Sequence, residues 1–154
     1  MRKTVLLAGV LLLLFQAASA AAQEGSLRFE KTVSWSTSKL IELNATVGPI
    51  KVAKVEFTDQ GKGRGGLIGR IRPGASELQT TLRAAFDVEN PKVDEWVVTF
   101  TLEFLDQDGK LIDRAVEKKG FEGESKVHRT DHAILEYVVP LIDKVRVKLE
   151  ARYD

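Results

Sequence analysis

Alternation of apolar and polar side chains with a period of two residues is the feature that most restricts how this chain can fold. Three segments show it most clearly: 78–89 (LQTTLRAAFDVE), 95–104 (EWVVTFTLEF) and 144–154 (KVRVKLEARYD). Successive side chains of a β-strand point to opposite faces, whereas an amphipathic helix repeats every 3.6 residues. These segments therefore predict three strands, each with one face in a hydrophobic core.

Weaker segments of the same kind extend the all-β pattern, and residues typical of turns separate them. The weaker strands are predicted at 26–35, 50–58, 109–118 and 125–130, with turns at 47–49, 89–94, 106–109 and 121–125. About seven short strands joined in this way predict an antiparallel immunoglobulin-like β-sandwich. A parallel sheet is disfavoured because it needs crossover helices between its strands. We predict a core that includes Phe29, Trp35, Phe86, Trp96, Phe100, Phe104, Val147 and Leu149.

One segment, TDHAILEYVVPLID, departs from the alternation. Asp131 could cap a short helix near 132–139 that ends at Pro140, although Ile134 to Val139 is also rich in the β-branched and aromatic residues of strands. We predict the helix and keep the strand as the alternative. Trp35, Trp96 and Tyr153 fall on apolar strand faces and are predicted to pack in the core.

The first residues have the three parts of a secretory signal: Arg2 and Lys3, an apolar run from Val5 to Phe15, and the small residues of QAASAAA. An apolar run of eleven residues is well short of the roughly 20 that a membrane-spanning helix needs. We therefore predict a signal peptide over 1–20, cleaved after Ala20 or after Ala22, and a single domain over 21–154 in a bacterial periplasmic or secreted protein.

Charge and cysteine content exclude several classes of function. Without Arg2 and Lys3 the chain would carry 21 basic and 22 acidic residues, so no global field favours nucleic acid or a membrane surface. The sequence has no cysteine, which excludes a disulfide framework, a thiolate nucleophile and a thiolate metal site. A chain of this length must then hold itself together with an ordinary hydrophobic core.

The central part of the sequence resembles a known family. The stretch VENPKVDEWVVTFTLEFLDQDGKLID, followed by FEGE, is similar to the small exported bacterial immunoglobulin-like domains of the FxLYD type, in which a long strand ends in an acidic residue and a D-x-x-G turn. Here the corresponding five residues are Leu102 to Asp106, and Asp106 is the one identical to the family motif. The resemblance implies a sandwich fold and no defined catalytic activity.

A glycine-rich stretch, GKGRGG at 61–66, has the G-x-G-x-x-G spacing of dinucleotide-binding loops. Such a loop must open a helix, but Gly69, Pro73 and Gly74 interrupt the residues that follow. We therefore predict a surface loop over 61–74 without a nucleotide or other cofactor. If the protein binds an acidic partner, the predicted contact residues are Lys62, Arg64, Arg70 and Arg72.

Candidate metal and hydrolytic motifs fail on context. His128, Asp131 and His132 lie within five residues, yet Asp131 is predicted as a helix cap and no further ligand is identifiable. The stretch DQDGKLID has a glycine at the fourth position from Asp106, where an EF-hand loop has one at the sixth. No G-x-S-x-G motif is present. We predict no metal and no catalytic residue.

The sequence thus favours a non-enzymatic, exported β-sandwich domain that acts as an envelope accessory or partner-binding module. A small-ligand or carbohydrate-binding module is the alternative, and an enzyme with an unrecognised site is the third possibility. Aromatic side chains exposed on one sheet face would favour sugar binding, and a deep polar pocket would favour either of the last two classes.

Overall fold

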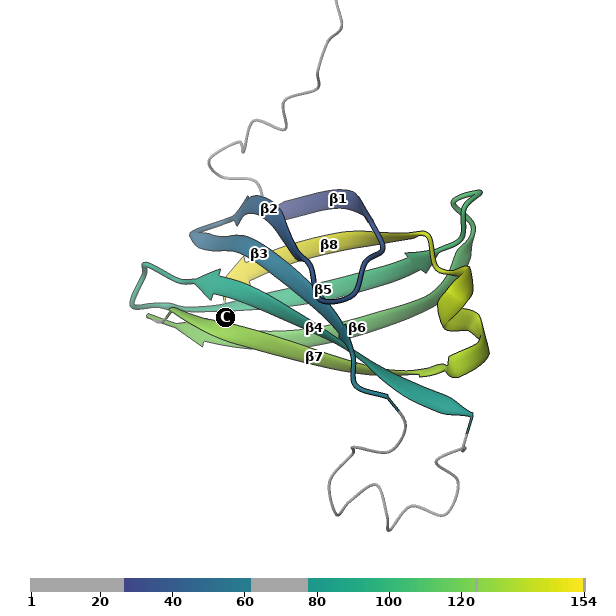
Figure 1. Ribbon diagram of the computed structural model, residues 1–154. Helices are drawn as coiled ribbons and strands as arrows, with labels where there is room; N and C mark the ends of the chain where they lie inside the picture. Colours follow the sequence, from purple (N-terminus) through teal and green to yellow (C-terminus); the bar gives the residue numbers. More distant parts are fainter. Residues whose placement is uncertain (1–26, 62–77, 124, 154) are drawn as a thin grey trace, which may run out of the picture.

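The computed structural model describes residues 27–61, 78–123 and 125–153, and these form two packed β-sheets (Figure 1). They contain eight strands and one 3₁₀ helix. In chain order these are β1 (Arg28–Ser34), β2 (Leu40–Val47), β3 (Ile50–Asp59), β4 (Gln79–Glu89), β5 (Glu95–Leu105), β6 (Leu111–Glu122), β7 (Ser125–Leu135), η2 (Glu136–Leu141) and β8 (Lys144–Tyr153).

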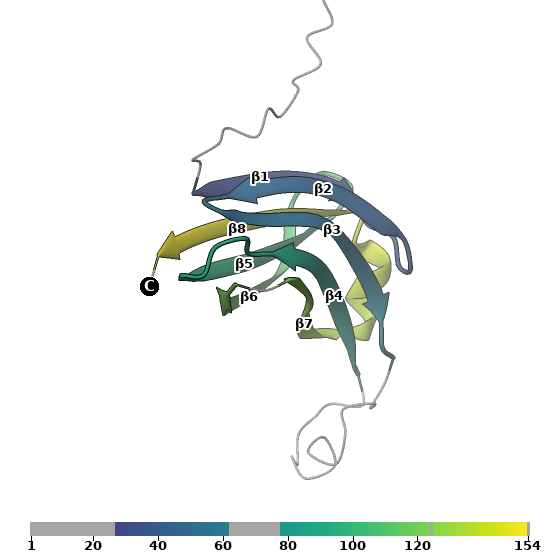
Figure 2. The same ribbon diagram turned by 90° about the vertical axis from the view of Figure 1, so that its left-hand side faces the viewer.

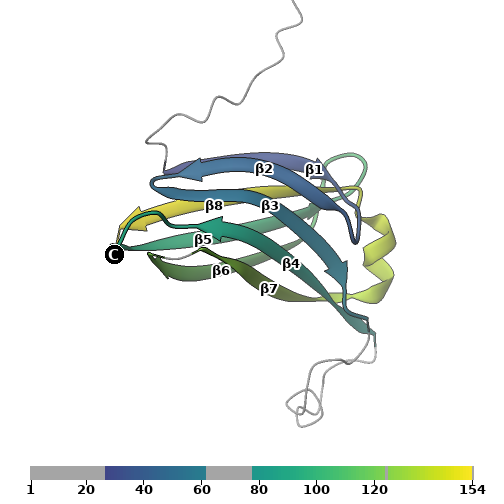
Figure 3. The ribbon, with the colours of Figure 1, turned by 60° about the vertical axis from the view of Figure 1, so that its left-hand side comes forward.

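Each sheet has four strands, and every strand pair is antiparallel. The β5 sheet has the order β1-β8-β5-β6, and the β4 sheet has the order β2-β3-β4-β7. Figures 2 and 3 show the two layers from the side, with β1 beside β2 along one margin and β6 beside β7 along the other. The predicted antiparallel β-sandwich is confirmed.

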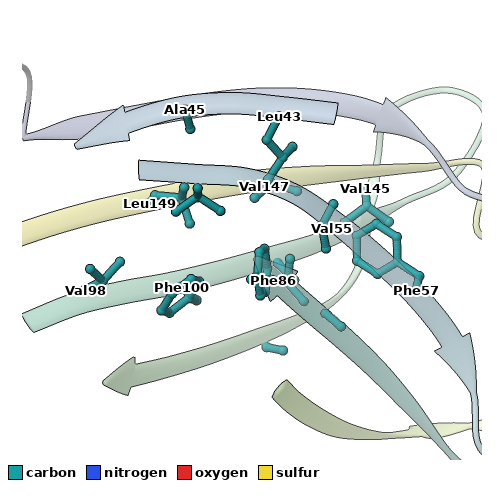
Figure 4. Close-up of a cluster of buried hydrophobic side chains, with 14 of the residues drawn as sticks. Leu43, Ala45, Val55, Phe57, Phe86, Val98, Phe100, Val145, Val147 and Leu149 are labelled. Carbon is teal, nitrogen blue, oxygen red and sulfur yellow. The ribbon is translucent and has the colours of Figure 1, made fainter. Parts of the chain in front are cut away.

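The core lies between the sheets and is built from the alternate apolar residues of the strands (Figure 4). Phe100 is at its centre: its ring is 4.8 Å from that of Phe86 in the opposite sheet and 6.1 Å from that of Phe121 on β6. Of the predicted core residues, Phe86, Phe100, Phe104, Val147 and Leu149 are fully buried, whereas Phe29, Trp35 and Trp96 are partly buried and pack against the core.

The eighth strand, β2, was not predicted. Its buried side chains do alternate, at Leu43, Ala45 and Val47, but a bulge between Glu42 and Ala45 shifts its register against β3. Asn44 at this bulge has φ +50°, a left-handed conformation that asparagine tolerates better than most residues. A strand that contains a bulge gives a weaker signal than a regular one.

The helix is displaced from its predicted position, and the predicted cap at Asp131 is wrong. Strand β7 pairs with β4 along its whole length, from Ser125 opposite Glu89 to Leu135 opposite Gln79, so the backbone stays extended through His132. Asp131 lies within this strand and accepts hydrogen bonds from the Arg83 guanidinium at 2.7 and 2.8 Å. The 3₁₀ helix begins only at Glu136 and contains Pro140.

Apolar residues at the ends of strands are less buried than the alternation predicts. Tyr153 is 62% exposed, which contradicts its predicted place in the core, and Leu78 is 61% exposed. Leu78 directly precedes β4, and Tyr153 is the last residue of β8. The Tyr153 ring still contacts that of Trp96, with centroids 5.7 Å apart.

The position of Gly48, in the turn between β2 and β3, requires a glycine. Its φ is +58°, and a Cβ atom there would lie 2.8 Å from the Trp96 ring. Both the backbone conformation and the contact with the ring therefore exclude a side chain. The turn thus positions Trp96 at the edge of the core.

Candidate functional site

The predicted contact residues Lys62, Arg64, Arg70 and Arg72 lie outside the described residues, as does the loop that contains them, apart from Gly61. The end of β3 and the start of β4, which border this loop, are joined through Asp59. Its Oδ1 atom accepts hydrogen bonds from the Thr80 hydroxyl at 2.6 Å and from the Gly61 backbone N–H at 2.8 Å. The strands on either side of the loop are therefore fixed to one another.

A second group of basic residues, which sequence reasoning did not single out, lies on the outer face of the β5 sheet. Val145, Val147 and Leu149 of β8 face the core, so the residues that alternate with them face outward. The strand register then identifies the residues of β1, β5 and β6 that lie on the same outer face. The outward positions carry seven basic residues against five acidic ones. The basic residues, which we call the cationic face, are Arg28, Arg114, Lys118, Lys144, Arg146, Lys148 and Arg152.

The centre of the cationic face is a buried carboxylate, Glu103. Its side chain is only 5% exposed although it points away from the core. Its oxygens lie 2.9 Å from Arg114 Nη2, 3.2 Å from Arg146 Nη1 and 3.0 Å from Lys148 Nζ. One carboxylate thus organises three cations from two neighbouring strands.

The charge of Glu103 is maintained by these partners. Burial raises its pKa, but the hydrogen bond from Lys148 and the charges of Lys148, Arg114 and Arg146 outweigh burial and hold the pKa below its usual range. The cluster of Glu103 and its three cations carries two positive charges that Glu103 does not balance. Glu30 lies 3.5 Å from Arg146 Nε and balances one of them.

A shallow hollow of about 560 Å³ adjoins this cluster over β1, β8 and β5. Thr99 and Thr101 line it together with Lys148 and Glu150. The side chains of Arg28 and Glu150 also line it and pair at 2.9 Å. The arrangement offers hydroxyl groups beside fixed cations, which suits a ligand with carboxylates or other anionic oxygens.

The candidate trio His128, Asp131 and His132, from which no metal site was predicted, does not come together in the structure. Because side chains alternate along β7, both histidines point between the sheets while Asp131 points outward to Arg83. Each histidine instead faces a carboxylate of β6: His128 faces Glu117, and His132 faces Asp113. In the part of the chain that the structure describes, no group of three potential metal ligands occurs.

The aspartates after β5 form a turn. The Asp106 Oδ1 atom accepts hydrogen bonds from the backbone N–H groups of Asp108 at 3.0 Å and Lys110 at 2.8 Å, and Gly109 has φ +78°. The Asp106 carboxylate therefore stabilises the turn. The partly exposed ring of Trp96 and the exposed ring of Tyr153 meet at 73° and do not form one flat platform.

No protein-family model matches this chain, and no curated protein matches it. The solved structures that match include the enzymatically active domain of tailspike protein 4 of bacteriophage CBA120, at 10% identity and a TM-score of 0.23. That match covers 84% of this chain and 18% of the tailspike chain. Likeness at this level carries no argument about function. Among the described residues, no helix has the length and apolar character needed to cross a membrane.

Proposed function

We propose that this chain is an exported, non-enzymatic β-sandwich domain that binds a partner, and that the cationic face meets an acidic surface or segment of that partner. The observation that carries the proposal is the group of three cations held by Glu103 on the outer face of the β5 sheet. The leader-like first residues support export. The resemblance to FxLYD-type domains implies a sandwich fold with no defined catalytic activity.

The cluster is suited to binding because its cations are already positioned. Glu103 holds Arg114, Arg146 and Lys148 in place, while their side chains remain 53%, 35% and 36% exposed. Side chains that are ordered before binding lose less conformational entropy on association. An acidic partner would therefore meet preorganised donors with a positive excess. Lys62, Arg64, Arg70 and Arg72 remain predicted contacts for the same class of partner.

The arrangement around the histidines does not favour a hydrolase. Thr130 Oγ1 lies 3.4 Å from His128 Nε2, and Glu117 approaches that same nitrogen at 3.7 Å. In a catalytic triad the nucleophile and the orienting carboxylate use opposite nitrogens of the ring. Thr130, His128 and Glu117 therefore do not have the geometry of a catalytic triad.

The test measures binding of the protein to immobilised poly-L-glutamate, with poly-L-lysine as the probe of opposite charge. A double variant, Arg146→Ser with Lys148→Ser, should weaken binding about tenfold, or about 1.4 kcal/mol, if each charge contributes about 0.7 kcal/mol. The matched control is Lys51→Ser with Lys54→Ser on β3 of the other sheet, where both residues are exposed.

The control pair should leave binding nearly unchanged, and raising salt should weaken binding of the wild type. Equal losses in the two double variants would mean that only net charge matters and would refute the cationic face as the site. Failure of the wild type to bind the acidic polymer at low salt would refute the acidic partner. Thermal melting of each variant shows whether a loss of binding comes from unfolding.

A further inference from the structure

The two margins of the sandwich are closed in different ways. At one margin Lys31 Nζ of β1 donates a hydrogen bond to the Glu42 backbone carbonyl of β2 at 2.8 Å. At the other margin β6 and β7 belong to different sheets and run beside each other (Figures 1 and 3). A hollow of about 390 Å³ between them is lined by Ala115, Glu117, Thr130 and His132, among others.

Two histidine–carboxylate pairs span this β6–β7 seam. Near the turn that joins the strands, His128 Nε2 lies 3.7 Å from Glu117 Oε2. Four residues further along β7, His132 Nε2 lies 3.0 Å from Asp113 Oδ2. Both pairs connect the β4 sheet to the β5 sheet, so both contribute to the contact between the sheets.

His128 is enclosed by the core. Its side chain is 7% exposed, and its ring centroid lies 4.7 Å from that of Phe100 on β5 and 5.8 Å from that of Phe121 on β6. From β4, Phe86 is its register partner. A positive charge on this ring would thus be placed among aromatic carbon atoms with little water.

The charged groups near His128 come from β6 and β7. Burial lowers its pKa, Glu117 opposes that effect, and the positive charges of Lys119 and Lys126 lower the pKa further. Lys126 lies over the ring of Phe121, which itself contacts His128: its Nζ atom is 5.2 Å from the Phe121 centroid. The closed seam therefore prefers a neutral His128.

His132 is closer to its carboxylate and more exposed than His128. Its side chain is 21% exposed, stacks on Phe104 with centroids 5.7 Å apart, and already contacts the Asp113 carboxylate. Leu82 is its register partner on β4. The hydrogen bond between His132 and Asp113 joins β7 to β6 at 3.0 Å, so this pair holds its end of the seam closed.

We propose that the β6–β7 seam is an acid-sensitive latch in which protonation of His128 loosens the packing of the two sheets around its ring, while the hydrogen bond between Asp113 and His132 holds the seam farther along the strands. Loosening would admit water to the rings of Phe100 and Phe121, which contact His128. The latch would thus weaken the contact between the two sheets in acidic surroundings.

The sign and size of the effect follow from proton linkage. In the open state His128 is hydrated and titrates near the ordinary histidine value of about 6.5, whereas the closed state holds its pKa lower. The closed state is therefore most favoured above about pH 6.5, and its advantage falls as the pH decreases from there to the lowered pKa. One proton changes the opening equilibrium by at most about tenfold per pH unit in this interval.

Hydrogen exchange read by mass spectrometry tests the latch on protein purified from cells that express the full chain. Peptides that cover Phe121 to Thr130 should lose protection between pH 7.5 and pH 5, after correction for intrinsic exchange, by up to about tenfold per pH unit. Peptides from β1 and β8 should keep theirs. His128→Phe should remove the pH dependence, while His132→Phe should retain it and extend it to the Asp113 end.

Unchanged protection of the Phe121 to Thr130 region in the wild type would overturn the proposal, and so would the same pH dependence in His128→Phe. Loss of protection over the whole chain would mean global unfolding and would also overturn it. If His128→Phe does not fold, an NMR titration of the wild type replaces it. The His128 ring should titrate below the ordinary range, and the Phe121 amide should follow the same midpoint. Titration of His128 at or above the ordinary value would refute the latch.

Discussion

Replacing Phe100 by alanine tests the core of this sandwich most directly. The Phe100 side chain is 1% exposed and contacts the rings of Phe86, Phe121 and His128, with centroids 4.7 to 6.1 Å away. Its partners come from both sheets, so the cavity cannot close by a shift of one strand. We therefore expect a loss of about 3–5 kcal/mol in the free energy of unfolding.

Urea denaturation followed by tryptophan fluorescence measures this loss, and the melting temperature should fall by roughly 10–20 °C. The m-value should stay constant, because the surface exposed on unfolding hardly changes. The matched control is Val116→Ala on β6, where the side chain is 57% exposed and the change should stay within about 0.5 kcal/mol. A loss below about 1 kcal/mol for Phe100→Ala would contradict its position at the centre of the core.

Three further predictions follow from single features. Gly48→Ala should destabilise the domain by about 1–3 kcal/mol in urea denaturation, more than Gly109→Ala, because both glycines have positive φ but only Gly48 faces the Trp96 ring. Glu103→Gln should cost about 1–2 kcal/mol near neutral pH, and this difference from the wild type should shrink as the pH falls through the lowered pKa of Glu103, because protonation then removes the same charge. A difference that stays constant in acid would contradict this role of the carboxylate. Intact-mass measurement of the exported protein should give a chain that begins at Ala21 or Gln23, and retention of residues 1–20 would contradict the predicted cleavage.

Part of the candidate site was accessible from sequence and part was not. The basic residues of the cationic face are visible in KVRVKLEAR as the polar half of an alternating strand. Glu103 reads as one more polar position in TLEF, because the sequence does not state which strands lie beside β5. Only the pairing of β5 with both β6 and β8 brings Arg114 and Arg146 to the same carboxylate.

The sequence by itself determined that the chain forms strands and which face of each regular strand is buried. The reason is local: side chains alternate across a strand, so Val98, Phe100 and Leu102 must share a face wherever that strand lies. Turn residues such as Asp106 and Gly109 act over a few residues and were also readable. The tertiary structure alone decided which strands became neighbours and where the strand near Asp131 ended. His128 and Glu117 meet because two sheets stack, and that depends on the packing of the whole core and not on any local pattern.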